Sequence, residues 1–354
     1  MGPLRTAKLA TLGALKKAGA FEAVANSAWR RSRLLILCYH GTSLGDEHQW
    51  RPALYLPPQI LEQRLQALRA MKCTILPLGE SLQRLQAGEL PPRSVAVTFD
   101  DGTYDFYRQA YPLLKKYEIP ATVYQTTYYS DNPMPVFNLI CSYMLWKRRE
   151  QKLSPILELH INEAMDLSTQ LARHKVVRCL VEQSDRDNLT GRQKDEIASR
   201  LASALGIDYS GLRAQRVLQL MNASEIAEVA KNGVDIQLHT HRHRTPEDEA
   251  LFRREINDNR QRLEAITGNV PQHFCYPSGV YGQKFVSWLE SDGVLSATTC
   301  DAGLVGRADN PFLLPRYVDT AGRTQLEFES WLSGVGALIA LRKAATQRYT
   351  VPDD

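Results

Sequence analysis

This sequence of 354 residues lacks several features that define other classes of protein. It contains no C-x-x-C pair, and its cysteines stand far apart in the chain. Several of them fall within apolar runs, where a free thiol behaves as a small hydrophobic side chain. We therefore expect free thiols and a reduced compartment, the cytoplasm. The six cysteines are Cys38, Cys73, Cys141, Cys179, Cys275 and Cys300.

A dominant charge is also missing. The 43 lysines and arginines and the 39 aspartates and glutamates give a formal net charge of +4, and the basic residues are scattered along the chain. A nucleic-acid-binding protein usually gathers its basic residues on one stripe or face. We therefore expect no nucleic-acid partner.

No hydrophobic run reaches the roughly 20 residues that a transmembrane helix needs, and the apolar segment 331–341 is too short. Residues 4–30 predict an amphipathic helix, but Lys16, Lys17 and Glu22 interrupt its apolar positions, so it does not resemble a secretory signal. We assign 1–32 to an N-terminal helical segment. It either packs on its own domain, the interpretation we favour, or makes peripheral contact with an anionic membrane surface.

Short apolar runs that end in polar residues alternate with helical patterns over most of the chain. This alternation predicts parallel strands joined by crossover helices. In such folds, ligands bind at the carboxyl ends of the strands. The number of runs favours a barrel over an open sheet. The runs are 34–39, 94–99, 121–125, 234–238, 273–276 and 295–299.

The stretch between the runs at 121–125 and 234–238 is far longer than one crossover helix requires. Helical periodicity recurs in 136–150, 155–181 and 191–205, and the polar residues 184–188 predict a loop. The sequence thus predicts a helical insertion in the main fold. We place the main fold in 33–130 and 218–325, the insertion in 131–217, and a C-terminal helix and tail in 326–354.

Two motifs at predicted strand ends carry residues suited to catalysis. The run V-T-F-D-D-G at 97–102 places Asp100 and Asp101 side by side where the chain turns, and H-T-H-R-H at 239–243 supplies His239 and His243. Two imidazoles and one carboxylate form a facial triad that suits zinc, iron, cobalt or nickel. Either motif alone is weak evidence, but together they predict a metal site.

These motifs resemble those of the polysaccharide deacetylase family, carbohydrate esterase family 4, which carries the NodB homology domain. The resemblance rests on T-F-D-D-G and H-T-x-x-H and covers roughly 33–130 and 218–320. It implies an α/β fold, a deformed (β/α) barrel, and removal of an acetyl group from a sugar nitrogen. It further implies that Asp100 is the general base, that Asp101, His239 and His243 bind a divalent metal, with zinc preferred, and that Thr240 braces the loop.

The chain departs from the family pattern at two places. An arginine that usually holds the catalytic aspartate is replaced by Cys275 in F-C-Y-P-S-G, and a late histidine that acts as general acid is absent from L-L-P-R-Y at 313–317. Arg316 would substitute for the first if it pairs with Asp100; otherwise it forms an ordinary salt bridge. His40, in I-L-C-Y-H-G, either faces the site from another strand end or is structural.

Residues that follow the predicted strands would shape the substrate site. Tyr276 and Tyr281 would stack on a sugar ring, or simply pack, and 277–279 would form a loop in the site wall. The candidate substrate-binding residues are Thr240, Tyr276, Pro277, Ser278 and Gly279.

We therefore predict a metal-dependent hydrolase that removes an N-acetyl group from a sugar of a polysaccharide or glycan precursor. Two alternatives stay open. One keeps the fold and opens another C–N bond, such as that of a cyclic amide. The other is a carbohydrate-binding protein that has lost turnover, which the missing arginine and late histidine would explain.

Overall fold

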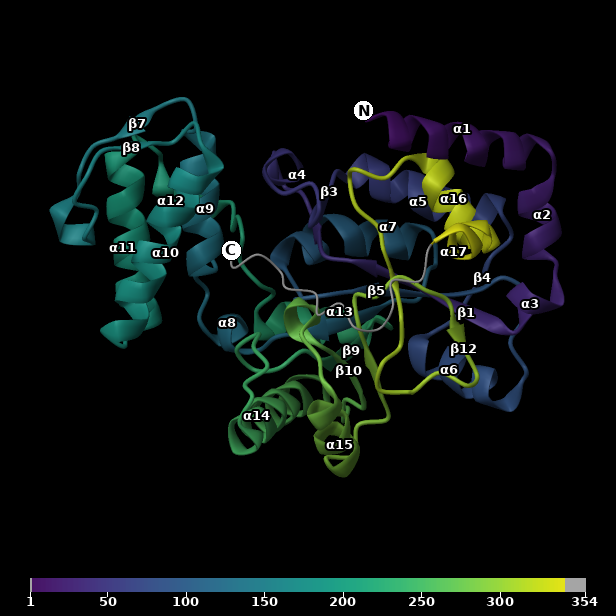
Figure 1. The fold of residues 1–354 in the computed structure, drawn as a ribbon. Helices are drawn as coiled ribbons and strands as arrows, with labels where there is room; N and C mark the ends of the chain where they lie inside the picture. Colours follow the sequence, from purple (N-terminus) through teal and green to yellow (C-terminus); the bar gives the residue numbers. More distant parts are fainter. Residues whose placement is uncertain (1, 341–354) are drawn as a thin grey trace.

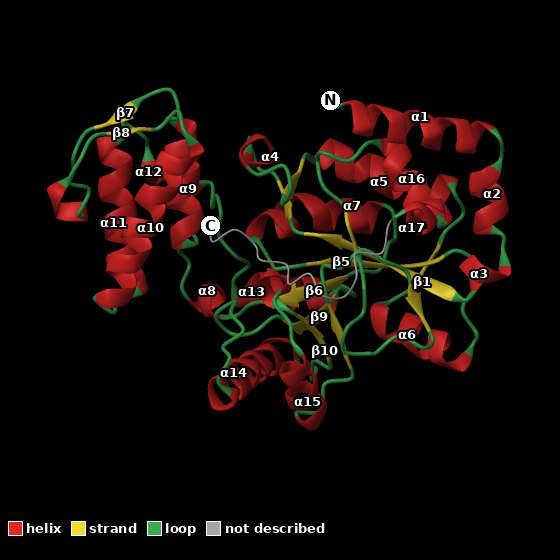
Figure 2. Ribbon diagram, viewed as in Figure 1, coloured by secondary structure: helices red, strands yellow, loops and turns green. Residues whose placement is uncertain are grey.

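The computed structural model describes residues 2–340, and its centre is a curled sheet of parallel strands (Figures 1 and 2). The strand order is β11-β10-β9-β6-β5-β1, and β13 pairs with the far side of β1 in parallel. All six predicted runs form strands of this sheet. The six strands are β1 (Arg33–Tyr39), β5 (Ser94–Phe99), β6 (Thr122–Gln125), β9 (Asp235–Leu238), β10 (His273–Cys275) and β11 (Ser296–Thr298); β13 (Tyr317–Val318) is an additional strand.

The segment that ends in β13 closes this sheet into a barrel. Leu314 forms a parallel bridge with Thr298 of β11, and Tyr317 and Val318 pair with β1. One short segment therefore joins the two edges of the sheet. The deformed (β/α) barrel predicted from the sequence is confirmed, and the closing strand is an element that the sequence analysis did not identify.

Side chains alternate between the two faces of the strands, as expected for a pleated sheet. In β1, Leu35 and Leu37 belong to the main core between the sheet and its helices, whereas Leu34 and Ile36 belong to a smaller core inside the barrel. Cys38 continues the inner set. The alternation thus directs particular residues toward the barrel interior, where the strand ends converge.

Helices surround the strands and connect them. They are α5 (Pro58–Ala70), α6 (Leu78–Ala87), a π-helical turn at Phe106–Ala110 that continues into α7 (Tyr111–Lys116), α8 (Tyr128–Asp131), α13 (Ala223–Lys231), α14 (Glu249–Thr267) and α15 (Gln283–Ser291). Two further short strands belong to the sheet: β4 (Thr74–Ile75) pairs with β5, and β12 (Val305–Gly306) pairs antiparallel with β1. Short elements at the barrel rim are β2 (Gly41–Thr42), α4 (Glu47–Trp50), β3 (Tyr55–Leu56) and a 3-10 turn at Pro277–Gly279.

The N-terminal segment forms three helices instead of the single predicted one: α1 (Pro3–Lys17), α2 (Ala20–Ala25) and α3 (Ala28–Arg31). Gly19 breaks the helix because its φ of 76° is left-handed, a conformation that glycine adopts at little cost. Leu12 of α1 is buried with Phe21 and Val335, and α1 lies along α16 (Gln325–Ser333) (Figure 1). The segment therefore packs on its own domain, as the favoured interpretation expected.

The residues between β6 and α13 form a separate helical cluster with its own hydrophobic core (Figure 1). That core also takes in Trp50, Leu54 and Tyr55 from the barrel rim, so the cluster rests against α4 and β3. Its elements are α9 (Phe137–Lys147), β7 (Lys152–Leu153), a 3-10 turn at Leu157–Leu159, β8 (Met165–Asp166), α10 (Gln170–Arg186), α11 (Gly191–Ala204) and α12 (Tyr209–Ala214).

Two details of this cluster correct the sequence analysis. The helix expected over 155–181 begins only at Gln170, capped by Thr169, because the preceding residues form the β7–β8 hairpin. The loop expected at 184–188 is largely helical. Ser184 is buried and donates its hydroxyl hydrogen bond to the Val181 carbonyl, so a polar residue fits inside α10.

After β13 the chain forms α16 and α17 (Val335–Ile339), and the predicted tail at 341–354 lies outside the described residues. Among residues 2–340, no helix is both long and apolar enough to cross a bilayer. The six cysteines are free thiols, as expected.

Candidate metal-dependent active site

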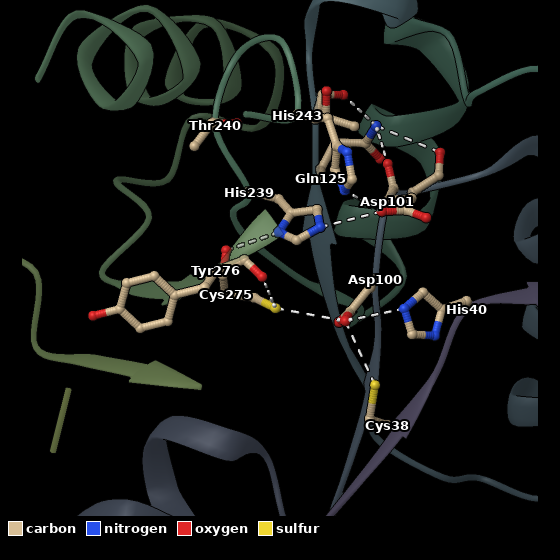
Figure 3. Close-up of polar contacts among 12 residues, drawn as sticks. Cys38, His40, Asp100, Asp101, Gln125, His239, Thr240, His243, Cys275 and Tyr276 are labelled. Carbon is tan, nitrogen blue, oxygen red and sulfur yellow. Dashed lines mark hydrogen bonds and ion pairs between the residues drawn. The ribbon is translucent and has the colours of Figure 1, made fainter. Parts of the chain in front are cut away.

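The two adjacent aspartates lie at a tight turn that directly follows β5. The Asp100 amide donates to the Tyr39 carbonyl at 2.9 Å and so extends the pairing of β5 with β1. Asp101 and Gly102 then adopt φ values of 70° and 72°. A Cβ atom on residue 102 would lie 1.9 Å from Gln125 Oε1, so only glycine fits. This turn brings both carboxylates to the same end of the barrel (Figure 3).

Asp100 is 3% exposed, and Arg316 binds both of its oxygens at 2.7 and 2.8 Å. Arg316 is itself fully buried and also donates to the Thr299 carbonyl at 2.8 Å. Burial raises the pKa of Asp100, but the charge and hydrogen bonds of Arg316 outweigh burial and hold that pKa well below its usual range. The pairing considered from the sequence is thus present, and it keeps Asp100 ionised.

Asp101 and the two histidines converge on one point. Asp101 Oδ1 lies 3.1 Å from His239 Nε2 and 3.1 Å from His243 Nε2 (Figure 3). Ligands of one tetrahedral zinc ion, with N and O bonds of about 2.0–2.1 Å, lie roughly 3.3 Å apart. The observed spacing is close to that value, so these three residues fit a divalent metal.

The orientation of His239 also suits a metal ligand. Its Nδ1 lies 2.8 Å from the Cys275 carbonyl oxygen, which can only accept, so Nδ1 carries the proton and donates it. Nε2 is then left with a lone pair that points toward Asp101. Metal-binding histidines are usually oriented by such a hydrogen bond from their second nitrogen.

His243 completes the set and is about one-third exposed. Burial lowers its pKa, but the Asp101 carboxylate outweighs burial, and the net shift is upward. The negative charge that attracts a proton to this imidazole attracts a cation in the same place.

The loop 239–243 is held in an unusual shape by α14. Thr240 and His243 have φ values of 60° and 55°, which cost free energy for residues other than glycine. Asn259 is fully buried and accepts the His239 amide at 3.0 Å, and buried Glu255 accepts the Arg242 amide at 2.8 Å. These two side chains, one helical turn apart, fix the loop backbone.

Other residues of this loop have supporting positions. The Thr240 side chain is fully buried, and its Oγ1 accepts the Arg244 amide at 3.0 Å. It therefore braces the loop, and because it is fully buried, the prediction that Thr240 contacts the substrate is wrong. His241 points away, because its Nδ1 lies 2.9 Å from Thr127 Oγ1.

His40 faces the site, as one of its two interpretations expected. Its Nε2 lies 3.6 Å from Asp100 Oδ2, and the side chain is 17% exposed (Figure 3). Cys38, two residues earlier on β1, places its sulfur 3.5 Å from the same oxygen. The Cys275 sulfur lies 3.5 Å from that oxygen and accepts from Arg316 at 3.1 Å.

The residues after β10 are divided between core and surface. Tyr276 is 1% exposed and donates to the Phe312 carbonyl at 3.1 Å, so its ring packs in the core and cannot stack on a sugar. Pro277 and Gly279 are buried, and Ser278 is exposed with a φ of 56°. Their predicted role as a loop in the site wall remains a prediction.

Sequence reasoning missed Asn259, Glu255 and Cys38. A glutamate and an asparagine four residues apart on an amphipathic helix resemble a solvated face, although both lie on the stripe of buried Ile256 and Leu263. That stripe was the available signal. Cys38 had none, because a cysteine in a buried strand is ordinary.

Comparison with known proteins places this site in a family. The family model described as polysaccharide deacetylase matches residues 87–153 and 192–296, which include both motifs. A poly-β-1,6-N-acetyl-D-glucosamine N-deacetylase of Staphylococcus epidermidis is 39% identical over 69 residues, 20% of this chain and 24% of that protein. The Staphylococcus aureus enzyme of the same name is 43% identical over 61 residues, 17% of this chain and 21% of that protein. This chain thus aligns with about a third or less of the length of the first curated relatives it matches.

Solved structures share the fold. The deacetylase PplD of Streptococcus pyogenes, solved in complex with acetate, is 19% identical, with a TM-score of 0.54 over 82% of this chain and 93% of that one. IcaB from Ammonifex degensii is 18% identical, with a TM-score of 0.53 over 86% and 97%. With its sequence match, its fold and its two motifs in place, the chain belongs to the polysaccharide deacetylase family.

Proposed function

We propose that this protein is a metal-dependent hydrolase that removes N-acetyl groups from a polysaccharide of N-acetylated sugars. The observation that carries the proposal is the position of Asp100. It is ionised, accepts two hydrogen bonds from Arg316, and lies next to a facial triad of Asp101, His239 and His243. Two relatives named for poly-β-1,6-N-acetyl-D-glucosamine support a polymer of N-acetylglucosamine as the substrate class.

Asp101, His239 and His243 would hold the ion, and we propose zinc, although cobalt, nickel and iron also suit this ligand set. When bound, a divalent ion polarises the acyl oxygen and lowers the pKa of a water molecule to about 7. Asp100 does not belong to this triad, so its carboxylate is not used to bind the ion and can accept a proton.

In the reaction we propose, Asp100 accepts a proton from the attacking water. Arg316 holds the carboxylate in place and keeps it ionised until the proton arrives. His40 then donates a proton to the departing amine nitrogen, since its imidazole lies 3.6 Å from Asp100 and, unlike the buried thiols of Cys38 and Cys275, reaches solvent. The residues of this chain thus supply a base and an acid for amide hydrolysis.

The alternative of a binding protein without turnover rested on a missing arginine and a missing histidine. Arg316 occupies the first role from the residue just before β13, and His40 is positioned for the second directly after β1. This arrangement favours turnover. The cyclic-amide alternative is left to experiment.

Residence in the cytoplasm and membrane contact through α1 remain proposals. Leu12 of α1 packs on the domain, and Lys8 and Lys16 form ion pairs with Glu327 and Glu329 of α16. Membrane contact would therefore rest on the remaining exposed residues of α1, such as Lys17, and would be electrostatic.

A substrate panel tests the proposed function. Zinc-loaded protein is incubated with β-1,6-linked and β-1,4-linked N-acetylglucosamine oligomers and with cyclic amides, and acetate, free amines and ring-opened products are measured. Acetate from a sugar oligomer with an equal amount of new free amine supports the proposal. Ring opening without acetate, or binding of oligomers without either product, contradicts it.

A further inference from the structure

Asp101, His239 and His243 are called the catalytic triad below. A second group of side chains that could bind a metal surrounds Asp100. Cys38, His40 and Asp100 each offer one donor atom, and these atoms lie within 4.8 Å of one another (Figure 3). Cys38 Sγ is 3.5 Å from Asp100 Oδ2, and His40 Nε2 is 3.6 Å from it. We propose that these three residues form a second cation site, and that a thiophilic divalent ion bound there inhibits the enzyme.

The spacing fits one tetrahedral ion. Bonds of about 2.3 Å to sulfur and 2.0–2.1 Å to nitrogen or oxygen place neighbouring ligands roughly 3.3–3.6 Å apart. The two measured separations fall at this range without any movement of the backbone. A site made of a thiolate, an imidazole and a carboxylate binds zinc or cadmium in preference to magnesium or calcium.

An ion can reach this site from the mouth of the barrel. Cys38 is fully buried, but the His40 side chain, which directly follows β1, is partly exposed to solvent. On binding, the ion displaces the thiol proton of Cys38, and a thiolate–metal bond forms with release of one proton to solvent. No oxidant or reductant is needed.

The third donor group, which consists of Asp100, His239 and Cys275, is a poorer candidate. His239 Nε2 already faces Asp101 in the catalytic triad, and the Cys275 sulfur accepts a hydrogen bond from Arg316 at 3.1 Å. The Cys38 sulfur has no such cationic donor in the described residues. Cys275 is therefore a matched control, since it is equally close to Asp100.

Occupation of the second site removes the base from the reaction. Asp100 Oδ2 would bind the ion in place of the proton from water, and the ion would compete with the Arg316 contact at 2.8 Å. Arg316 is positively charged and repels a cation bound beside Asp100. The ion at the second site should therefore bind more weakly than the ion held by Asp101, His239 and His243. The inhibition, though not the binding, rests on the proposed function.

Cobalt titration of the whole protein, with Cys38→Ser and Cys275→Ser beside it, tests the site. The triad of Asp101, His239 and His243 contains no sulfur, so a near-ultraviolet thiolate-to-cobalt band reports a site that includes a cysteine, and the two variants show which cysteine supplies it. We expect this band in the parent after the first equivalent of cobalt, retention in Cys275→Ser, and complete loss in Cys38→Ser. Cys38→Ala replaces the serine variant if the latter does not fold.

Acetate release is then measured with one equivalent of zinc and with excess zinc. We expect excess zinc to inhibit the parent and Cys275→Ser but not Cys38→Ser. Absence of the band in the parent, its survival in Cys38→Ser, or a band without inhibition would overturn the proposal. A Cys38-dependent band in a protein that never releases acetate supports the cation site and contradicts the proposed function instead.

Discussion

At the residue scale, the decisive interaction is the buried pair of Asp100 and Arg316. A buried carboxylate is costly unless it is paired and hydrogen-bonded, and Arg316 supplies a bidentate partner with both members almost fully buried. The pair therefore both stabilises the fold and prepares the base. Its effect on stability can be separated from its effect on catalysis.

Replacing Arg316 by Met should lower the free energy of unfolding by about 3–5 kcal/mol, because it leaves the Asp100 charge buried without a partner. The double variant Asp100→Asn/Arg316→Met should recover part of this loss. Urea unfolding of the two single variants and the double variant measures the coupling. Equal destabilisation by Arg316→Met in both backgrounds would show that the pair contributes no coupling energy.

Asp105 should make the stability of the folded protein depend on pH, separately from any effect on catalysis. Burial, together with Glu47 and Asp101, raises its pKa to about 7, despite hydrogen bonds from the Thr42 amide and the Thr103 hydroxyl. The folded-state pKa exceeds the unfolded value of about 3.9. The folded protein therefore binds this proton more tightly, and the resulting stability is present below about pH 4 and lost as pH rises toward 7.

The expected result is that Asp105→Asn stabilises the metal-free protein more at about pH 8 than at about pH 5. Urea midpoints of the parent and the variant at the two pH values provide the measurement. A constant difference between them would mean that Asp105 does not titrate in this range.

At the element scale, α14 determines the shape of the metal-binding loop. Asn259 accepts the His239 amide and also donates to the Gln125 carbonyl and to Thr127 Oγ1, each at 3.0 Å. It thus ties the loop after β9 to the end of β6. Such outer residues often determine how well a metal is held.

Asn259→Ala should weaken metal binding by about 10- to 100-fold, since the His239 backbone loses its support. Exposed Asn257→Ala on the same helix is the control and should bind metal as the parent does. Competition with a zinc chelator measures both affinities. Equal zinc affinity in the two variants would exclude a positioning role for Asn259.

The elements also show what the sequence could predict. β5 was predicted at its observed bounds, because a β-branched and aliphatic run that ends abruptly at Asp-Asp-Gly is typical of a strand and its end, and all six of its residues are buried. β13 has only two residues and forms through its pairing with β1, so no local sequence pattern predicts it. Arg316 was nevertheless considered as the partner of Asp100, because its motif stood where a family histidine was expected.

At the scale of the whole molecule, the N-terminal and C-terminal segments are joined across the barrel. Arg30 is fully buried and donates to the carbonyls of Leu332, Arg33 and Ser94 at 3.3, 2.7 and 3.2 Å. It therefore connects α3, α16 and two strands of the sheet. Burial lowers its pKa to about 10, so it remains charged at neutral pH.

Arg30→Met should destabilise the protein by about 1–3 kcal/mol for each buried carbonyl that loses its donor. The neighbouring, exposed Arg31→Met should have little effect. Urea unfolding provides the comparison. Similar midpoints for Arg30→Met and the parent would show that water or other donors replace the guanidinium.

The overall architecture followed from the alternation of strands and helices, and the ligand triad followed from two motifs at strand ends. What could not be predicted depends on contacts between distant segments. Tyr276 is an example: its sequence position beside a loop suggested a sugar-stacking ring, but its neighbours Phe274 and Phe285 enclose it in the core. Burial of this kind is set by the whole fold and not by local sequence.

The central claim is that Asp100 is the base of a metal-dependent deacetylation and is not itself a ligand. Acetate release and bound zinc are measured together for the parent, metal-stripped parent and Asp100→Asn. We predict that the stripped parent is inactive until zinc is restored, and that Asp100→Asn retains zinc but loses about 10²- to 10⁴-fold in rate. Full activity in Asp100→Asn, or in the stripped parent, would contradict the account.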